Sequence, residues 1–139
     1  MSKTVRIVED IMSANDDLAQ QNQTKLNQSR TLAINVMASP GSGKTSVILQ
    51  TIAALRDHCQ IGVVEGDTAA VTIDADKVIS AGMPAVQINT GGSCHLDAVM
   101  LSKALPELPL DTVDLLIVEN VGNLICPASH ELGEHLRIV

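Results

Sequence analysis

The chain has 139 residues, 45% of them hydrophobic, a net charge of −7, and no Phe, Tyr or Trp. Its length and hydrophobic content predict one folded domain with an aliphatic, Met-containing core and argue against disorder throughout. Binding to nucleic acid is disfavoured by the acidic balance and the lack of aromatic rings, and no apolar run reaches the ~20 residues of a membrane span. The first residues carry no secretory signal, so we expect a cytoplasmic location.

The first predicted element is an amphipathic helix over residues 4–28. Its apolar residues include helical spacings, with acids and amides between them: Val5, Ile7, Val8, Ile11, Met12 and Leu18. Residues 13–15 are a candidate interruption, and residues 20–29 are polar with little apolar surface. We therefore expect residues 1–29 to form a helix that packs on the domain or on a partner, followed by a linker, and residues 30–139 to form the main domain.

From Thr31 onward the pattern alternates strands and helices, which predicts a parallel sheet with helical crossovers. Strands are expected at residues 31–37, 60–66, 85–88 and 113–118, with a fifth opening at 137–139. Helices are expected at residues 46–56, 72–81 and 96–105, with a short one around 129–134. Ligands of such sheets bind at the carboxyl ends of the strands, so the segments that follow strands are the candidate sites.

The segment after the first strand, Ser-Pro-Gly-Ser-Gly-Lys-Thr at residues 39–45, is typical of a loop that cradles nucleotide phosphates. Gly41 and Gly43 can adopt positive φ, and successive backbone N–H groups at a helix N-terminus bind an anion. Lys44 would reach the β- and γ-phosphates, and Thr45 would bind Mg²⁺. The full pattern G-x-x-x-x-G-K-[ST] has a glycine where this chain has Ala38, so a glycine-rich turn that binds nothing is the alternative.

Two acids at strand ends are candidates for the magnesium environment. Asp67 follows the second predicted strand and Glu119 ends the fourth, where a P-loop fold places the carboxylate that completes the Mg²⁺ site. Residues 119–122 also resemble the Asp-x-x-Gly of GTPases, in which the glycine N–H meets the γ-phosphate. The alternative for each acid is a helix cap or a surface charge. We predict catalytic roles for Lys44, Asp67 and Glu119, and nucleotide contacts from Pro40, Gly41, Ser42, Gly43, Lys44, Thr45, Ser46 and Gly122.

Cys94-His95 and Cys126 lie in two loops that follow different strands. Thiolate and imidazole suit Zn²⁺ or Ni²⁺, but three ligands leave a site incomplete unless water or a second subunit adds to it. An odd count of three cysteines favours free thiols or metal ligands over a disulfide framework. A buried thiol with a surface histidine fits the residue types equally well. The remaining thiol is interpreted as structural, and the remaining imidazoles have no spacing that indicates ligation: Cys59, His58, His130 and His135.

Five stretches together resemble the hydrogenase nickel-incorporation GTPases, the HypB family. They are the loop 39–45, Val-Glu-Gly-Asp at 64–67, Gln-Ile-Asn-Thr-Gly-Gly at 87–92, Cys-His-Leu-Asp-Ala at 94–98, and Glu-Asn-Val-Gly-Asn-Leu-Ile-Cys-Pro-Ala at 119–128. The fourth and fifth are far more specific than the phosphate loop. The related urease accessory GTPase carries its ligands in a Cys-Pro-His arrangement, which is absent here.

The resemblance implies an α/β P-loop NTPase three-layer sandwich with a mostly parallel sheet, C-terminally incomplete, of the SIMIBI class. It implies GTP or GDP with Mg²⁺, a homodimer, and partners in a nickel metallochaperone and the hydrogenase large subunit. It also implies Zn²⁺ or Ni²⁺ bound by Cys94, His95 and Cys126 near the dimer interface. The family's guanine-reading Asn-Lys-x-Asp motif has no counterpart in this sequence. A metal-binding and dimerisation module without turnover is therefore one alternative, and an ATP-dependent small-molecule kinase is another.

Overall fold

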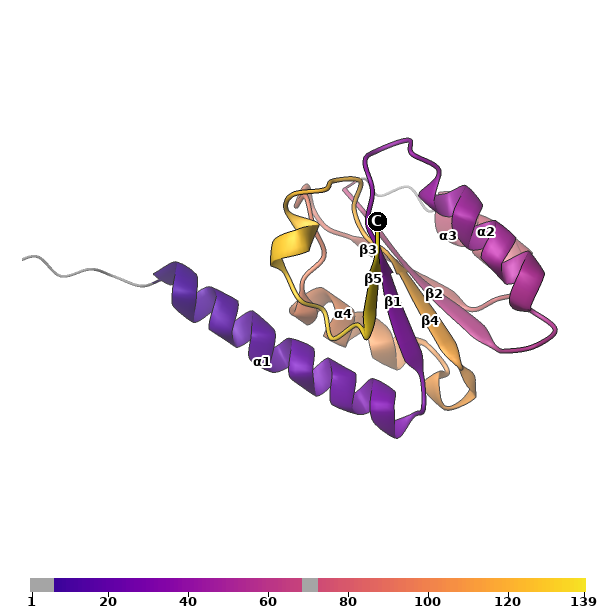
Figure 1. Ribbon diagram of the computed structural model, residues 1–139, viewed down its shortest axis with the longest axis horizontal. Helices are drawn as coiled ribbons and strands as arrows, with labels where there is room; N and C mark the ends of the chain where they lie inside the picture. Colours follow the sequence, from indigo (N-terminus) through magenta and orange to yellow (C-terminus); the bar gives the residue numbers. More distant parts are fainter. Residues whose placement is uncertain (1–6, 69–72) are drawn as a thin grey trace, which may run out of the picture.

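The computed structural model describes residues 7–68 and 73–139, which form a parallel five-stranded sheet with the order β3-β2-β4-β1-β5 (Figure 1). The strands are β1 (Leu32–Val36), β2 (Ile61–Asp67), β3 (Ala85–Asn89), β4 (Leu115–Glu119) and β5 (Leu136–Ile138). The helices are α1 (Ile7–Gln28), α2 (Lys44–Leu55), α3 (Ile73–Ser80) and α4 (Ala98–Ala104), with 3-10 turns at Leu105–Glu107, Leu110–Thr112 and Pro127–Ser129. None of the described helices is both long and apolar enough to cross a bilayer. The predicted sheet, its parallel strands and its helical crossovers are confirmed.

The sheet is covered on both faces, with α2 and α3 on one side and α1 and α4 on the other (Figure 1). Successive residues of β4 point to opposite faces, as the pleat of a strand requires. Leu116 and Val118 pack in the core beneath α1 and α4, whereas Ile117 packs in the core beneath α2 and α3. Apolar residues at every position of a strand therefore mark a sheet that is buried on both faces.

The register brings the carboxyl ends of three strands to the same edge of the sheet. Val36 of β1 lies opposite Glu119 of β4, and Glu119 lies opposite Glu65 of β2. Because ligands of parallel sheets bind at this edge, the loops after β1, β2 and β4 are placed together where a site is expected.

Two predicted helix boundaries moved for local reasons. The helix after the phosphate loop begins at Lys44, because Gly43 is its N-cap and Lys44 and Thr45 already belong to its first turn. Helix α4 begins at Ala98, because Asp97 is its N-cap. The Asp97 carboxylate accepts a hydrogen bond from the Met100 N–H at 2.9 Å. The predicted starts of the other two helices, residues 4–6 and Thr72, lie outside the described residues.

The helix predicted around residues 129–134 is wrong. The chain instead makes a 3-10 turn at Pro127–Ser129 and then an irregular turn. Gly133 has φ +103°, and a Cβ there would lie 2.4 Å from the Ala19 carbonyl oxygen, so the backbone of this turn contacts α1 directly. The Glu134 carboxylate accepts a hydrogen bond from the Leu132 N–H at 2.8 Å, which holds the turn in place of helical hydrogen bonds.

The predicted end of the first helix at residue 28 is confirmed, because α1 continues to Gln28, and the polar residues 20–28 belong to this helix rather than to a linker. The predicted interruption at residues 13–15 is absent from this continuous helix as well. Its buried face has the helical spacing Asn15, Ala19, Asn22 and Leu26, whereas Ile11 of the predicted apolar face is 60% exposed. The division of the chain at residue 29 remains a proposal.

Buried amides explain this unexpected face of α1. The Asn22 side-chain N–H group donates to the carbonyl oxygens of Ala98 and Leu132, each at 2.9 Å. The Asn15 amide accepts from the Ala98 N–H and donates to the Glu131 carbonyl, again at 2.9 Å. Two asparagines of α1 therefore bind the start of α4 and the turn at residues 131–134 to each other.

We expect Asn22→Ala to lower the free energy of unfolding by about 1–3 kcal/mol, because it removes two buried hydrogen bonds to backbone carbonyl oxygens. Urea unfolding followed by circular dichroism measures the change. Gln21→Ala is the matched control on the exposed side of the same turn, and it should change stability by less than about 0.5 kcal/mol. Equal stability of the two variants would show that these hydrogen bonds contribute nothing.

Candidate nucleotide and metal sites

The phosphate loop leaves open space at the N-terminus of α2. Gly41 has φ +71° and Gly43 has φ +100°, and a Cβ at either position would meet no atom within 4 Å. Other residues would be strained in this left-handed conformation, so glycine is needed for the backbone rather than for packing. A bare backbone facing open space in front of a helix N-terminus fits a phosphate group.

A polar cavity of about 420 Å³ lies over this loop, at the carboxyl ends of the strands. Most of the predicted nucleotide and magnesium residues line it: Pro40, Gly41, Gly43, Lys44, Thr45, Ser46, Asp67, Glu119 and Gly122. Three lining residues were missed from the sequence: Gly66, Lys77 and Asn120. Ser42 does not line the cavity, and its N–H donates to the Ser39 carbonyl at 3.3 Å.

Lys44 and Thr45 both make contacts at the floor of the cavity. The Lys44 ammonium group folds back to the carbonyl oxygens of Ala38 and Ser39, at 3.4 Å each. The Thr45 hydroxyl donates to the Glu119 carboxylate, whose oxygens lie at 3.0 and 3.3 Å. With Asp67 on the same wall, this set of hydroxyl and carboxylate oxygens fits Mg²⁺, which prefers hard oxygen ligands.

The loop after β4 contacts the phosphate loop through Gly122. A Cβ on Gly122 would lie 2.9 Å from Cα of Pro40, a distance that real Cβ atoms do not reach. A side chain at residue 122 would therefore push the two loops apart. The glycine of the Glu-x-x-Gly stretch is required here by close packing of backbone on backbone.

The side chains of Cys94, His95 and Cys126 lie close together, although the first two residues follow β3 and the third follows β4. Their ligand atoms all lie within 4.8 Å of one another, and Cys94 Sγ is 3.7 Å from His95 Nδ1. The Asn123 side chain accepts from the N–H groups of Ile125 and Cys126 at 2.7 and 3.1 Å, which shapes the second loop. Two thiols and an imidazole at these separations fit Zn²⁺ or Ni²⁺.

The surroundings shift the pKa values of two of these candidate ligands, His95 and Cys126. Burial, followed by the nearby His130, lowers the pKa of His95, with Asp97 acting in the opposite direction. A hydrogen bond with Cys94, together with burial, raises the pKa of Cys126. The lowered pKa favours the neutral imidazole of His95, which is the form that can bind a metal, and the raised pKa favours the protonated thiol of Cys126, whose proton a metal would have to displace.

The sequence did not reveal that His130 is a neighbour of the candidate metal ligands. Its ring stacks on that of His95, with ring centroids 3.7 Å apart. Because His130 lies four residues beyond Cys126 in an irregular turn, no periodic spacing could have indicated the contact.

The two sites are joined through Asn120, which is buried beside Glu119. Its side-chain carbonyl accepts from the Leu96 N–H at 3.0 Å, directly after the Cys94-His95 pair. Its amide N–H group donates to Asn35 at 3.1 Å. Asn120, which follows Glu119 of the candidate nucleotide cavity, is thus hydrogen-bonded to the loop that carries the candidate ligands Cys94 and His95.

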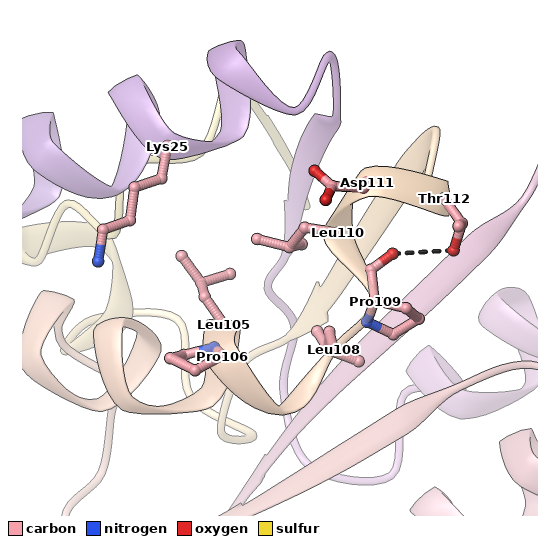
Figure 2. Close-up of a pocket in the computed structure, with 8 residues that line it drawn as sticks. All are labelled: Lys25, Leu105, Pro106, Leu108, Pro109, Leu110, Asp111 and Thr112. Atoms are coloured by element: carbon pink, nitrogen blue, oxygen red, sulfur yellow. Dashed lines mark hydrogen bonds between the residues drawn. The ribbon is translucent and has the colours of Figure 1, made fainter.

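A second cavity, of about 460 Å³, lies between the end of α1 and the connection from α4 to β4 (Figure 2). Leu105 and Leu110, which belong to this connection, extend their side chains into the space between it and α1, and the Thr112 hydroxyl donates to the Pro109 carbonyl at 2.9 Å. Its lining is mainly apolar and includes none of the predicted site residues. The polar cavity over the phosphate loop is therefore the nucleotide candidate.

Comparison with known proteins identifies the family. A family model described as CobW/HypB/UreG, nucleotide-binding domain, matches residues 32–136. The chain belongs to this family. The match spans the phosphate loop, both loops that carry the candidate metal ligands, and strands β1 to β4, and it ends at the first residue of β5, so it covers both candidate sites of this CobW/HypB/UreG domain.

Relatives and solved structures agree with the family. Hydrogenase maturation factor HypB of Escherichia coli (strain K12) is 44% identical over 129 residues, which are 93% of this chain and 44% of that protein. The probable hydrogenase maturation factor HypB of Methanocaldococcus jannaschii is 46% identical over 133 residues, 96% of this chain and 60% of that protein. The crystal structure of HypB from Helicobacter pylori in complex with nickel has a TM-score of 0.84 at 41% identity, and covers 91% of this chain and 59% of that one.

The chain spans about half the length of the curated relatives that it matches. The resemblance to HypB and the P-loop fold drawn from the sequence are confirmed at the level of family and architecture. The roles of individual site residues remain predictions.

Proposed function

We propose that this chain is the nucleotide- and metal-binding part of a GTPase that assists nickel insertion into [NiFe]-hydrogenase. The observation that carries the proposal is the pairing of two sites at one edge of the sheet: a phosphate-loop cavity and a Cys-Cys-His group. One segment, residues 119–126, contributes to both. The relatives named as hydrogenase maturation factors, and the HypB structure solved with nickel, support the assignment.

At the nucleotide site, GTP would place its phosphates over Gly41 and Gly43. Lys44 would leave the carbonyl oxygens of its own loop to bind the β- and γ-phosphates. Thr45 and Asp67 would hold Mg²⁺, which supplies charge neutralisation at those phosphates. No arginine or histidine is among the described residues that line the cavity, so we infer slow intrinsic hydrolysis.

Coupling between the sites would run through the segment after β4. Glu119 contacts Thr45, and Gly122 packs on the phosphate loop. A γ-phosphate bound at that loop would therefore change the surroundings of both Glu119 and Gly122. Asn120 holds the loop of Cys94 and His95, while Asn123 shapes the loop of Cys126. If the segment after β4 has two conformations and GTP binds one of them more tightly than GDP does, exchange of the nucleotide would shift the positions of the candidate metal ligands.

The incomplete ligand set is consistent with a homodimer. Three donors per chain leave a Zn²⁺ or Ni²⁺ site open, and a second copy could supply the rest. The resemblance stated above adds a nickel metallochaperone, the hydrogenase large subunit and a cytoplasmic location to the proposal.

Binding of GDP and ADP, measured by calorimetry with Mg²⁺ present, tests the nucleotide half of the proposal. Selective binding of GDP is expected. Selective binding of ADP would favour the ATP-dependent kinase, and weak, unselective binding or none would leave the metal-binding and dimerisation module. That second function is favoured by one observation: the metal-ligand group is assembled within residues 94–126, independently of any guanine-reading motif.

A further inference from the structure

His130 joins the two loops that carry the metal ligands. On one side its ring stacks on His95, with centroids 3.7 Å apart and 16° between the ring planes. On the other side its Nδ1 lies 2.9 Å from the carbonyl oxygen of Cys126. A single side chain therefore contacts a ligand from the loop after β3 and the backbone of a ligand from the loop after β4.

The hydrogen bond to Cys126 sets the protonation of the ring. A carbonyl oxygen only accepts, so Nδ1 of His130 carries the hydrogen and donates it. This bond restrains both the ring and the Cys126 backbone, whose N–H is already held by Asn123. The loop is thus fixed on both sides of Cys126.

The turn that carries His130 is itself held by α1. The next residue, Glu131, accepts a hydrogen bond from Asn15 at 2.9 Å, and Leu132 accepts one from Asn22 at 2.9 Å. Leu132 is fully buried. His130 is therefore anchored to the helical layer of the domain.

We propose that His130 is a positioning residue of the metal site, which orients His95 by stacking and Cys126 by its hydrogen bond. The inference rests on the proposed metal-binding function. Contacts of this kind, made by residues that touch the ligands, commonly change metal affinity by about 10–100-fold. They act by holding the donors near the bound geometry before the metal arrives.

The ring geometry distinguishes this role from that of a fourth ligand. The lone pair of an imidazole nitrogen lies in the ring plane, so a bound ion lies close to that plane. The rings of His95 and His130 are stacked with only 16° between their planes, so the two planes do not intersect near the rings. An ion held by His95 would therefore lie off the plane of His130.

Co²⁺ titration of the 139-residue chain tests the inference, because cobalt reports both affinity and the donor set in its visible spectrum. The variants are His130→Ala, which removes both contacts, and His130→Phe, which keeps a stacking ring but removes the hydrogen bond. His58→Ala is the control, since that histidine is exposed and follows α2 at the opposite end of the sheet. Far-UV circular dichroism confirms that each variant is folded.

We expect His130→Ala to weaken Co²⁺ binding about tenfold or more, and His130→Phe to weaken it less. At saturation both should show the band positions and thiolate charge-transfer intensity of the unchanged chain, because the donors are the same. Unchanged affinity in both variants would overturn the inference. Shifted bands at saturation would also overturn it, because His130 would then be a ligand. If neither the unchanged chain nor the His58→Ala control binds Co²⁺, the proposed metal function itself fails.

Discussion

Replacing Lys44 by alanine is expected to abolish detectable binding of guanine nucleotide. Asp67 and Glu119 line the same cavity, so a polyphosphate enters beside two carboxylates and needs the ammonium group to offset repulsion. A hydrogen bond to a charged group contributes about 1.5–3 kcal/mol, and more than one phosphate oxygen is within the proposed reach of Lys44. The loss of affinity should therefore be about 100-fold or more.

Calorimetry with GDP and Mg²⁺ measures this loss, and Lys103→Ala is its matched control. Lys103 is exposed on α4, in the layer on the other side of the sheet, so its removal changes the net charge equally without touching the cavity. Zn²⁺ affinity should be unchanged in both variants, which shows that the fold is intact. If Lys44→Ala still binds the nucleotide, the assignment of residues 39–45 as a phosphate-binding loop is wrong.

Replacing Cys94 or Cys126 by alanine is expected to remove tight binding of Zn²⁺ and Ni²⁺. Each substitution takes away one of three donors, and the two that remain leave at least half of a tetrahedral site to water. We expect the affinity to fall by about 100-fold or more, since structural Zn²⁺ binding contributes about 10–16 kcal/mol over its full ligand set.

Competition with a chromophoric chelator measures the metal affinity, and Cys59→Ala is the matched control. Cys59 is a half-buried thiol packed against the apolar core beneath α2 and α3, so the same atoms are removed away from the site. Its variant should bind metal normally. If Cys94→Ala and Cys126→Ala bind as tightly as this control, the three residues are not the metal site.

Metal affinity should also fall as the pH is lowered. The pKa of Cys126 is raised above its ordinary value, chiefly by its hydrogen bond with Cys94, so metal must displace a proton at neutral pH. The pKa of His95 is lowered, chiefly by burial, so its imidazole competes less with protons. Chelator competition repeated between pH 6 and pH 8 should therefore show a steady rise in affinity, and a flat profile would indicate that neither thiol is a ligand.

Local pattern in the sequence determined the sheet, the phosphate loop and the candidate ligands. Runs of apolar residues, Gly-Lys-Thr before a helix, and acids at strand ends such as Asp67 and Glu119 are contiguous features. Each has a local physical cause, namely burial on both faces, positive φ, or a helix N-terminus. A short window of residues was therefore enough to predict them.

Only the tertiary structure decided the contacts between segments far apart in the chain. Asn15 fell in a predicted interruption of the first helix and Asn22 in its polar tail, yet both are buried, because their amides meet backbone groups more than 70 residues away. His130 had no spacing that indicated ligation, yet its ring stacks on that of His95. Glycine is required at residue 122 because the backbone of Pro40 packs against it, not because of the conformation of its own turn. Burial of a polar side chain depends on partners that the fold supplies, so these roles could not be read from residue type and spacing.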